Sequence, residues 1–182
     1  MSATIRQYDD VINVCKDIFF KKAKDYGTSW RVLRTISVID QIYIKALRIR
    51  NLQEVKVQKV ADDIPAEFKG IINYAAIGLI QLKLKAVSVE DLSADEVERL
   101  YNEQIGFAQQ TMLAKNHDYG EAWREMSQES FVDLILMKLL RMKSILLNEE
   151  KLLASEGLDA NYVDILNYAV FAMILMDEQQ SR

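Results

Sequence analysis

Apolar residues recur at helical spacing along most of the chain. An amphipathic helix is predicted over residues 5–24, where apolar side chains return every three or four positions: Ile5, Tyr8, Ile12, Cys15 and Phe19. The same pattern predicts five more helices, over residues 37–54, 65–86, 93–116, 130–153 and 159–179. The segment between residues 55 and 64 is short and is interpreted as a linker. The pattern therefore predicts an all-α fold of six main helices.

Serines stand where several of these helices are expected to begin. Ser37 and Ser130 are predicted N-caps, because a serine hydroxyl can accept a hydrogen bond from a free amide of the first turn. Asp40 and Asp133 follow three residues later, where a carboxylate favours the positive end of a helix. We interpret these two aspartates as helix-start residues before considering any role as ligands.

The chain repeats itself. DYGTSWR at residues 25–31 returns as DYGEAWR at residues 118–124, 93 positions later, and SVIDQIYIKALRIR (37–50) returns as SFVDLILMKLLRMK (130–143). The matches keep the same order along almost the whole length, so we interpret the chain as a duplicated three-helix unit. We expect a single domain, 1–182, with halves of about 1–88 and 93–182 packed as a pseudo-twofold bundle, because three short helices bury too little surface alone.

Composition and net charge exclude several fold classes and several classes of partner. Six glycines and one proline in 182 residues supply too few turns for a many-stranded β fold. A net charge of −4 argues against an extended nucleic-acid surface, which requires a basic face. The single cysteine, Cys15, suits a reducing cytoplasm, where we expect the protein. No signal peptide or unbroken apolar span is visible, so we expect no membrane association.

The repeated DYGxxWR motif supplies the first candidate binding residues. They are Asp25, Tyr26, Trp30 and Arg31 in the first half, and Asp118, Tyr119, Trp123 and Arg124 in the second. The aromatic rings either pack beside the turn or stack on a nucleobase. The acidic and basic residues that frame them could recognise a base edge and a phosphate, whereas the glycines most simply end the preceding helices.

Paired cations form the second candidate group. Lys45 and Arg48 in the first half match Lys138 and Arg141 in the second. Spacing of three residues places both heads on one side of a helix. With the arginine of the preceding turn, each pair would form an anion site of three cations. The alternative is a solvated face, or ion pairs with Asp25, Asp40 and their equivalents.

Asparagine recurs inside two apolar helices, in the motif NYA, as Asn73 and Asn167. A buried amide costs free energy unless it finds hydrogen-bond partners. The two amides could form hydrogen bonds to the DYG turn or to a ligand. The alternative is that both are structural asparagines near the pseudo-twofold axis.

Acidic residues give a candidate metal site. Glu67 and Asp164 lie in aligned segments, and each half holds one of the two carboxylates of an E-x-x-D pair. Two carboxylates one helical turn apart can bind Mg²⁺. The pair is incomplete in both halves, so the sequence establishes no cofactor. Mg²⁺ is the one candidate that it leaves open.

The strings KDYGTSWRVLRTISVIDQIYIKALRIR and EFKGIINYAAIGLIQL resemble the family called nucleotide modification associated domain, first type. This resemblance covers essentially the whole chain and implies an all-helical protein linked to nucleotides or their modification. The chain is less closely similar to the MazG-like all-α nucleoside triphosphate pyrophosphatases, helical and often dimeric proteins in which E-x-x-E and E-x-x-D motifs bind Mg²⁺. It departs from them because no E-x-x-E motif is present at a matching place.

Two hypotheses follow. In the first, the chain binds a small nucleotide or phosphate ligand between its helices and, if it is an enzyme, hydrolyses a phosphoanhydride with Mg²⁺. In the second, it is a non-catalytic helical interaction module whose repeated motifs hold the halves together, and an oligomer is possible in either case. The motifs should converge on a cleft under the first hypothesis and should be buried and mutually paired under the second.

Overall fold

The computed structural model describes residues 3–55, 59, 63–85, 87–148 and 157–180, and within them all regular secondary structure is helical. The six α-helices are α1 (Ala3–Tyr26), α2 (Thr35–Val55), α3 (Ile64–Leu84), α4 (Ala94–Tyr119), α5 (Gln128–Leu147) and α6 (Leu158–Gln180). Two short 3₁₀ turns, η1 (Ser29–Val32) and η2 (Ala122–Glu125), follow α1 and α4. The predicted all-α fold is confirmed.

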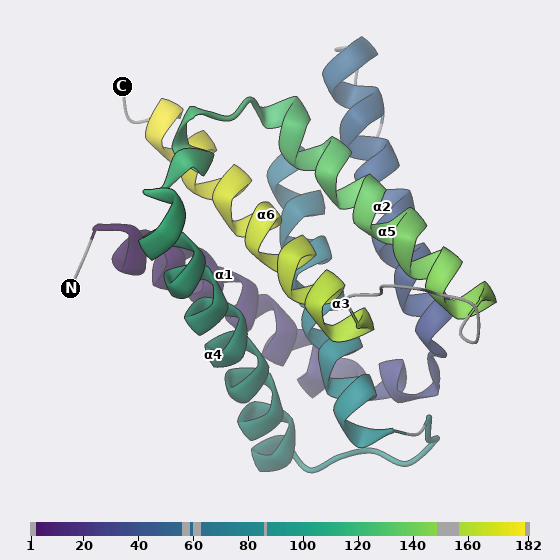
Figure 1. Cartoon of the computed structure of the whole chain (residues 1–182). Coiled ribbons are helices and arrows are strands. Elements are labelled where there is room, and N and C mark those ends of the chain that lie inside the picture. The colour runs from purple at the N-terminus through teal and green to yellow at the C-terminus, as the bar shows by residue number, and fades with distance from the viewer. Residues whose placement is uncertain (1–2, 56–58, 60–62, 86, 149–156, 181–182) are drawn as a thin grey trace.

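The helices form three layers. α3 and α6 pack against each other in the middle, α2 and α5 cover one side of this pair, and α1 and α4 cover the other (Figure 1). The contact between α3 and α6 is close at Gly78, where any side chain would collide with the buried ring of Tyr162. Residues of α3 and α6 make up more of the buried core than those of either outer layer.

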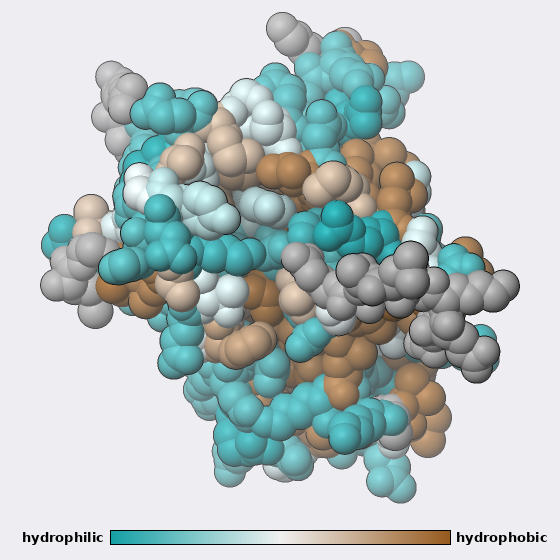
Figure 2. All heavy atoms as spheres, in the orientation of Figure 1, coloured by the Kyte–Doolittle hydropathy of each residue, from teal (hydrophilic) through white to brown (hydrophobic). Residues whose placement is uncertain are grey.

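The burial of α6 explains its composition. By length and hydropathy α6 could cross a membrane, but 78% of its most apolar window is buried inside the fold. A helix in a middle layer has neighbours on most sides and needs apolar residues around most of its circumference. Polar side chains cover much of the face seen in Figure 2, and apolar side chains gather on its right-hand side, where α2 and α5 lie.

Both glycine stops are confirmed, whereas two predicted N-caps are wrong. Gly27 and Gly120 end α1 and α4 with φ of +61° and +62°, a conformation that favours glycine. α2 begins at Thr35, so Ser37 lies inside its first turn, and α5 is capped by Ser127, whose hydroxyl accepts from the amide of Ser130. Each 3₁₀ turn ends only two residues before these helices, which start earlier than the serine spacing predicts.

The shift moves Asp40 and Asp133 one turn into their helices, away from the first turn. Their carboxylates form ion pairs across the α2–α5 contact instead: Asp40 Oδ1 lies 2.6 Å from Lys143 Nζ, and Asp133 Oδ1 lies 3.7 Å from Arg50 Nη1. Both pairs join equivalent positions of the two halves. α5 ends at Leu147, and residues 149–153 of the predicted helix lie outside the described part of the chain.

Candidate functional site

Asn73 and Asn167 make matching hydrogen bonds that tie the halves together. The hydroxyl of Tyr101 donates to Asn73 Oδ1 over 2.9 Å, and Asn73 Nδ2 donates to the carbonyl of Cys15 over 3.0 Å. In the other half, the hydroxyl of Tyr8 donates to Asn167 Oδ1 over 2.9 Å, and Asn167 Nδ2 donates to the carbonyl of Ala108 over 3.0 Å. Each middle-layer asparagine thus links α1 with α4. These are the contacts of structural asparagines, and neither amide bonds to a DYG turn.

The arginines of the two DYGxxWR motifs brace their own turns. Arg31 is buried at 6% exposure, and its guanidinium donates to the side chain of Gln81 on α3. The Gln81 amide in turn donates to the carbonyls of Arg31 and Leu33, both over 2.9 Å. This exchange fixes η1 against α3 and keeps Arg31 away from Lys45 and Arg48.

Arg124 has an even larger set of partners. Its guanidinium donates to Glu121 over 2.8 Å and to Glu178 over 2.9 Å, and it lies 4.4 Å from the ring centroid of Trp123. The same group donates to Thr4 Oγ1 over 2.8 Å, so it connects η2 with the start of α1 and the end of α6. The predicted three-cation clusters that include Arg31 and Arg124 therefore do not form.

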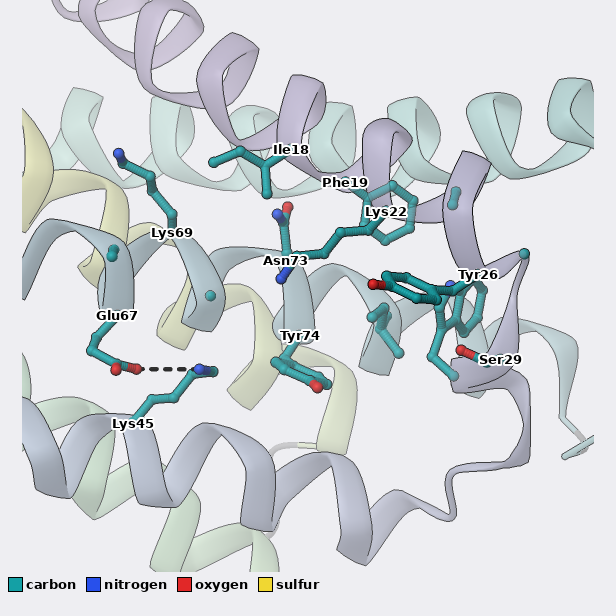
Figure 3. A pocket seen from close by; sticks show the side chains of 16 residues that line it. Ile18, Phe19, Lys22, Tyr26, Ser29, Lys45, Glu67, Lys69, Asn73 and Tyr74 are labelled. Atoms are coloured by element: carbon teal, nitrogen blue, oxygen red, sulfur yellow. Dashed lines mark hydrogen bonds and ion pairs between the residues drawn. The ribbon is translucent and has the colours of Figure 1, made fainter. Parts of the chain in front are cut away.

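A pocket of about 410 Å³ opens in the first half between α1, η1, α2 and α3 (Figure 3). Its lining includes five predicted site residues: Tyr26, Trp30, Lys45, Glu67 and Asn73. It also includes Phe19, Lys22 and Lys69, which the sequence did not single out. Lys22 has a sequence signal, because it matches Lys115 at the repeat offset, whereas Lys69 matches Val163 and has none.

The pocket has an aromatic end and a charged end. Tyr26 and Ser29 lie at one end in Figure 3, and Trp30 packs 6.2 Å from the ring of Phe19 in the same lining. Lys45 and Glu67 lie at the opposite end. Tyr26 is 71% exposed, so its ring faces solvent and is open to a stacking partner.

Lysines outnumber acidic residues in the pocket lining. Glu67 is buried, and its carboxylate accepts from Lys45 Nζ over 3.2 Å and from Arg48. Two cations thus compensate one buried carboxylate, which holds Lys45 in place. Lys22 and Lys69 also reach the pocket, so its lining carries three lysines against one glutamate. The surplus positive charge favours an anionic ligand.

The matching residues of the second half contact one another. Trp123 is buried and stacks on Phe171 with ring centroids 4.2 Å apart, where the first half has Ile77. Lys138 and Lys115 both bind the carboxylate of Asp164, over 2.7 Å and 2.6 Å. In the second half, side chains of the protein itself therefore contact one another at the positions that match the first-half pocket.

One family model matches both halves of the chain. Residues 22–82 and 115–176 both match the model of nucleotide modification associated domain 1. The chain belongs to this family. Its name associates the domain with nucleotide modification, and the two matched segments lie one in each half of the repeat. No curated protein and no solved structure matches the chain.

The remaining predicted site residues are judged by their position in the structure. Asp25, Asp118 and Tyr119 lie exposed at the two DYG turns, and Asp118 contacts only its neighbour His117 in the bonds described. Arg141 is exposed on α5. Among the described residues, the predicted first-half group lies together around a pocket, whereas Lys138 and Asp164 of the second half contact each other directly.

The two carboxylates considered as Mg²⁺ ligands do not fit such a site. Mg²⁺ requires oxygen ligands at short distance and near-octahedral geometry. Glu67 and Asp164 lie in different halves, each is already neutralised by two cations, and the described residues contain no cluster of three or more potential metal ligands. A magnesium ion would have to displace two cations from a single carboxylate.

Proposed function

We propose that the chain binds a nucleotide in the pocket of its first half. The observation that supports this most directly is the division of one cavity into an aromatic end and a lysine-rich end. A nucleobase would stack on the rings of Tyr26 and Trp30, since aromatic side chains accept any base face. The phosphate would lie at the other end, within reach of Lys22, Lys45 and Lys69.

The size and charge of the pocket agree with this ligand. Its volume of about 410 Å³ lies within the roughly 300–1,000 Å³ of pockets that take small molecules. Positive charge gathers here although the whole chain carries a net charge of −4. Glu67 contributes indirectly, because it holds Lys45 in position and limits the repulsion among the lysines. The proposal is one of binding, and it includes no hydrolysis.

A helical interaction module is the second candidate, and a separate observation favours it. Ile44 and Leu47 on α2 are 55% and 40% exposed, and their equivalents on α5, Met137 and Leu140, are 45% and 54% exposed. Matched apolar side chains on adjacent helices are typical of a surface that meets another protein. This surface lies on α2 and α5, outside the pocket lining, so both functions are compatible with one structure.

The nucleotide proposal is tested by calorimetric titration with the 5′-mono-, di- and triphosphates of adenosine and thymidine, and with both free nucleosides. Lys22→Met and Lys69→Met should each weaken binding of the phosphorylated ligands by about tenfold or more, the value of one charge-assisted hydrogen bond. Neither lysine has an ion pair within the described residues, so both variants should keep their stability.

Lys24→Met is the matched control, because it removes the same charge from an exposed position of α1 outside the pocket lining. It should bind like the wild type. The proposal fails if no nucleotide binds, or if the control loses as much affinity as the two pocket variants.

A further inference from the structure

We infer that Asp164 occupies, in the second half, the place that the anionic group of the ligand takes in the first half. This inference rests on the proposed function and adds a position for the phosphate and a stoichiometry. It follows from three equivalent pairs of positions in the repeat: Gly70 with Asp164, Lys22 with Lys115, and Lys45 with Lys138.

In the second half the site is complete. Asp164 Oδ1 lies 2.6 Å from Lys115 Nζ, and Asp164 Oδ2 lies 2.7 Å from Lys138 Nζ, so each carboxylate oxygen meets one ammonium group. Asp164 is 8% exposed and Lys138 is 6% exposed. Burying an ammonium group is expensive unless an anion compensates it, and this carboxylate is part of that compensation.

The first half has no carboxylate at this position. Gly70 has no side chain, and the flexible side chain of Lys45 lies against it: a Cβ atom there would be 2.9 Å from Lys45 Cε and 3.2 Å from Lys45 Nζ. Lys22 and Lys45 both line the pocket beside Gly70, and in Figure 3 they approach α3 from α1 and α2. Lys45 already binds Glu67, but Lys22 has no ion pair within the described residues. The first half thus keeps both lysines at the pocket but has no carboxylate at the position of Asp164.

An anion with two or more acceptor oxygens matches this arrangement. A phosphate above Gly70 could accept from Lys22 and Lys45 as the Asp164 carboxylate does from Lys115 and Lys138. The second half has no corresponding place, because its own carboxylate takes it and the Trp123–Phe171 stack fills the aromatic end. The chain therefore binds one ligand, in the first half.

Inorganic pyrophosphate is the probe, because it tests the anion position without a base. In calorimetric titrations the wild type should bind one pyrophosphate per chain. Gly70→Asp should weaken this binding at least tenfold by copying the second-half ion pairs. Gly70→Asn adds a side chain of the same size without the charge and should weaken it less.

The second half supplies an independent variant. Asp164→Ala removes both the internal anion and the side-chain atoms that occupy its place, so the variant should bind a second pyrophosphate, and pyrophosphate should raise its melting temperature by more than that of the wild type. Asp133→Ala on the neighbouring helix α5 is the control, since it removes an exposed carboxylate from a distant ion pair and should gain no site.

The outcomes separate the two proposals. Suppose that the wild type binds nucleotides, that Gly70→Asp binds pyrophosphate like the wild type, and that Asp164→Ala gains no second site: the position assigned to the anion is then wrong while the proposed function stands. If Gly70→Asp does not fold, the Asp164→Ala stoichiometry decides alone: two pyrophosphates support the assignment and one overturns it. If the wild type binds neither nucleotides nor pyrophosphate, both proposals fail.

Discussion

Replacing Tyr8 by phenylalanine removes one hydroxyl from the hydrogen-bond system that joins the two halves. Burial raises the pKa of Tyr8 well above its ordinary value, so the hydroxyl is protonated and donates to Asn167 Oδ1 over 2.9 Å. Phenylalanine keeps the ring and its packing. The variant therefore tests the hydrogen bond almost alone.

The magnitude follows from burial. Tyr8 is fully buried and Asn167 is 5% exposed, so water cannot replace the lost donor. Leaving a buried acceptor unsatisfied costs about 1–3 kcal/mol. In a chain of this size each kcal/mol lowers the melting temperature by about 2–4 °C, so we expect a fall of about 2–12 °C. Tyr101→Phe should fall at the lower end, because its partner Asn73 lines the pocket, where water can approach.

The assay is urea unfolding followed by circular dichroism, with m-values compared to verify that the unfolded states are alike. Tyr162→Phe is the matched control: this ring is equally buried, but its hydroxyl has no hydrogen-bond partner within the described residues. The control should unfold at the same urea concentration as the wild type or a higher one. Equal midpoints for Tyr8→Phe and Tyr162→Phe would refute a structural role for the NYA asparagine.

Three further predictions concern single positions. Gly78→Ala should lower the free energy of unfolding by about 1–3 kcal/mol in urea titrations, because the added methyl collides with Tyr162, whereas Gly106→Ala meets no neighbour and should not destabilise. Burial raises the pKa of Cys15 to about 12, so a thiol reagent at neutral pH should modify it only after unfolding, and rapid labelling of the native protein would contradict the structure. Hydrogen bonds from Thr28, beside the first DYG turn, lower the pKa of Asp91. Its carboxylate therefore stabilises the fold above the unfolded pKa of about 3.8, and this contribution is lost as the pH falls through the folded pKa. In acid unfolding, Asp91→Asn should consequently lose less stability than the wild type.

The helices and the repeat could be predicted from the sequence because both are local patterns. Apolar spacing marks a helix without knowledge of its neighbours, and Gly27 and Gly120 mark two ends because few other residues adopt their φ. The N-caps were harder. Ser127 and Ser130 both stand near the start of α5, and only the length of the preceding 3₁₀ turn selects Ser127 as the cap.

The candidate site depends on contacts between distant segments, which local patterns do not show. Arg31 was predicted to join Lys45 and Arg48 because all three are basic and close in sequence. It instead turns to Gln81 on α3, a partner 50 residues away that no repeat marks. Lys69 was missed for the opposite reason, since it lies in the pocket but has no basic counterpart in the second half.

Positions that are identical in the two halves and positions that differ between them therefore indicate different things: the first mark contacts between the halves, and the second mark the ligand site. Residues that stayed identical include Tyr8 and Tyr101 with Asn167 and Asn73, and their bonds cross from one half to the other, so a change in either half would break a shared contact. Binding to a ligand imposes no such reciprocity, because one working pocket is sufficient for one ligand. The positions that differ around the pocket, above all Gly70 against Asp164, are consequently better guides to function here than the repeated motifs. Introducing a carboxylate at residue 70 tests that argument at a pocket position where only the second half carries a negative charge.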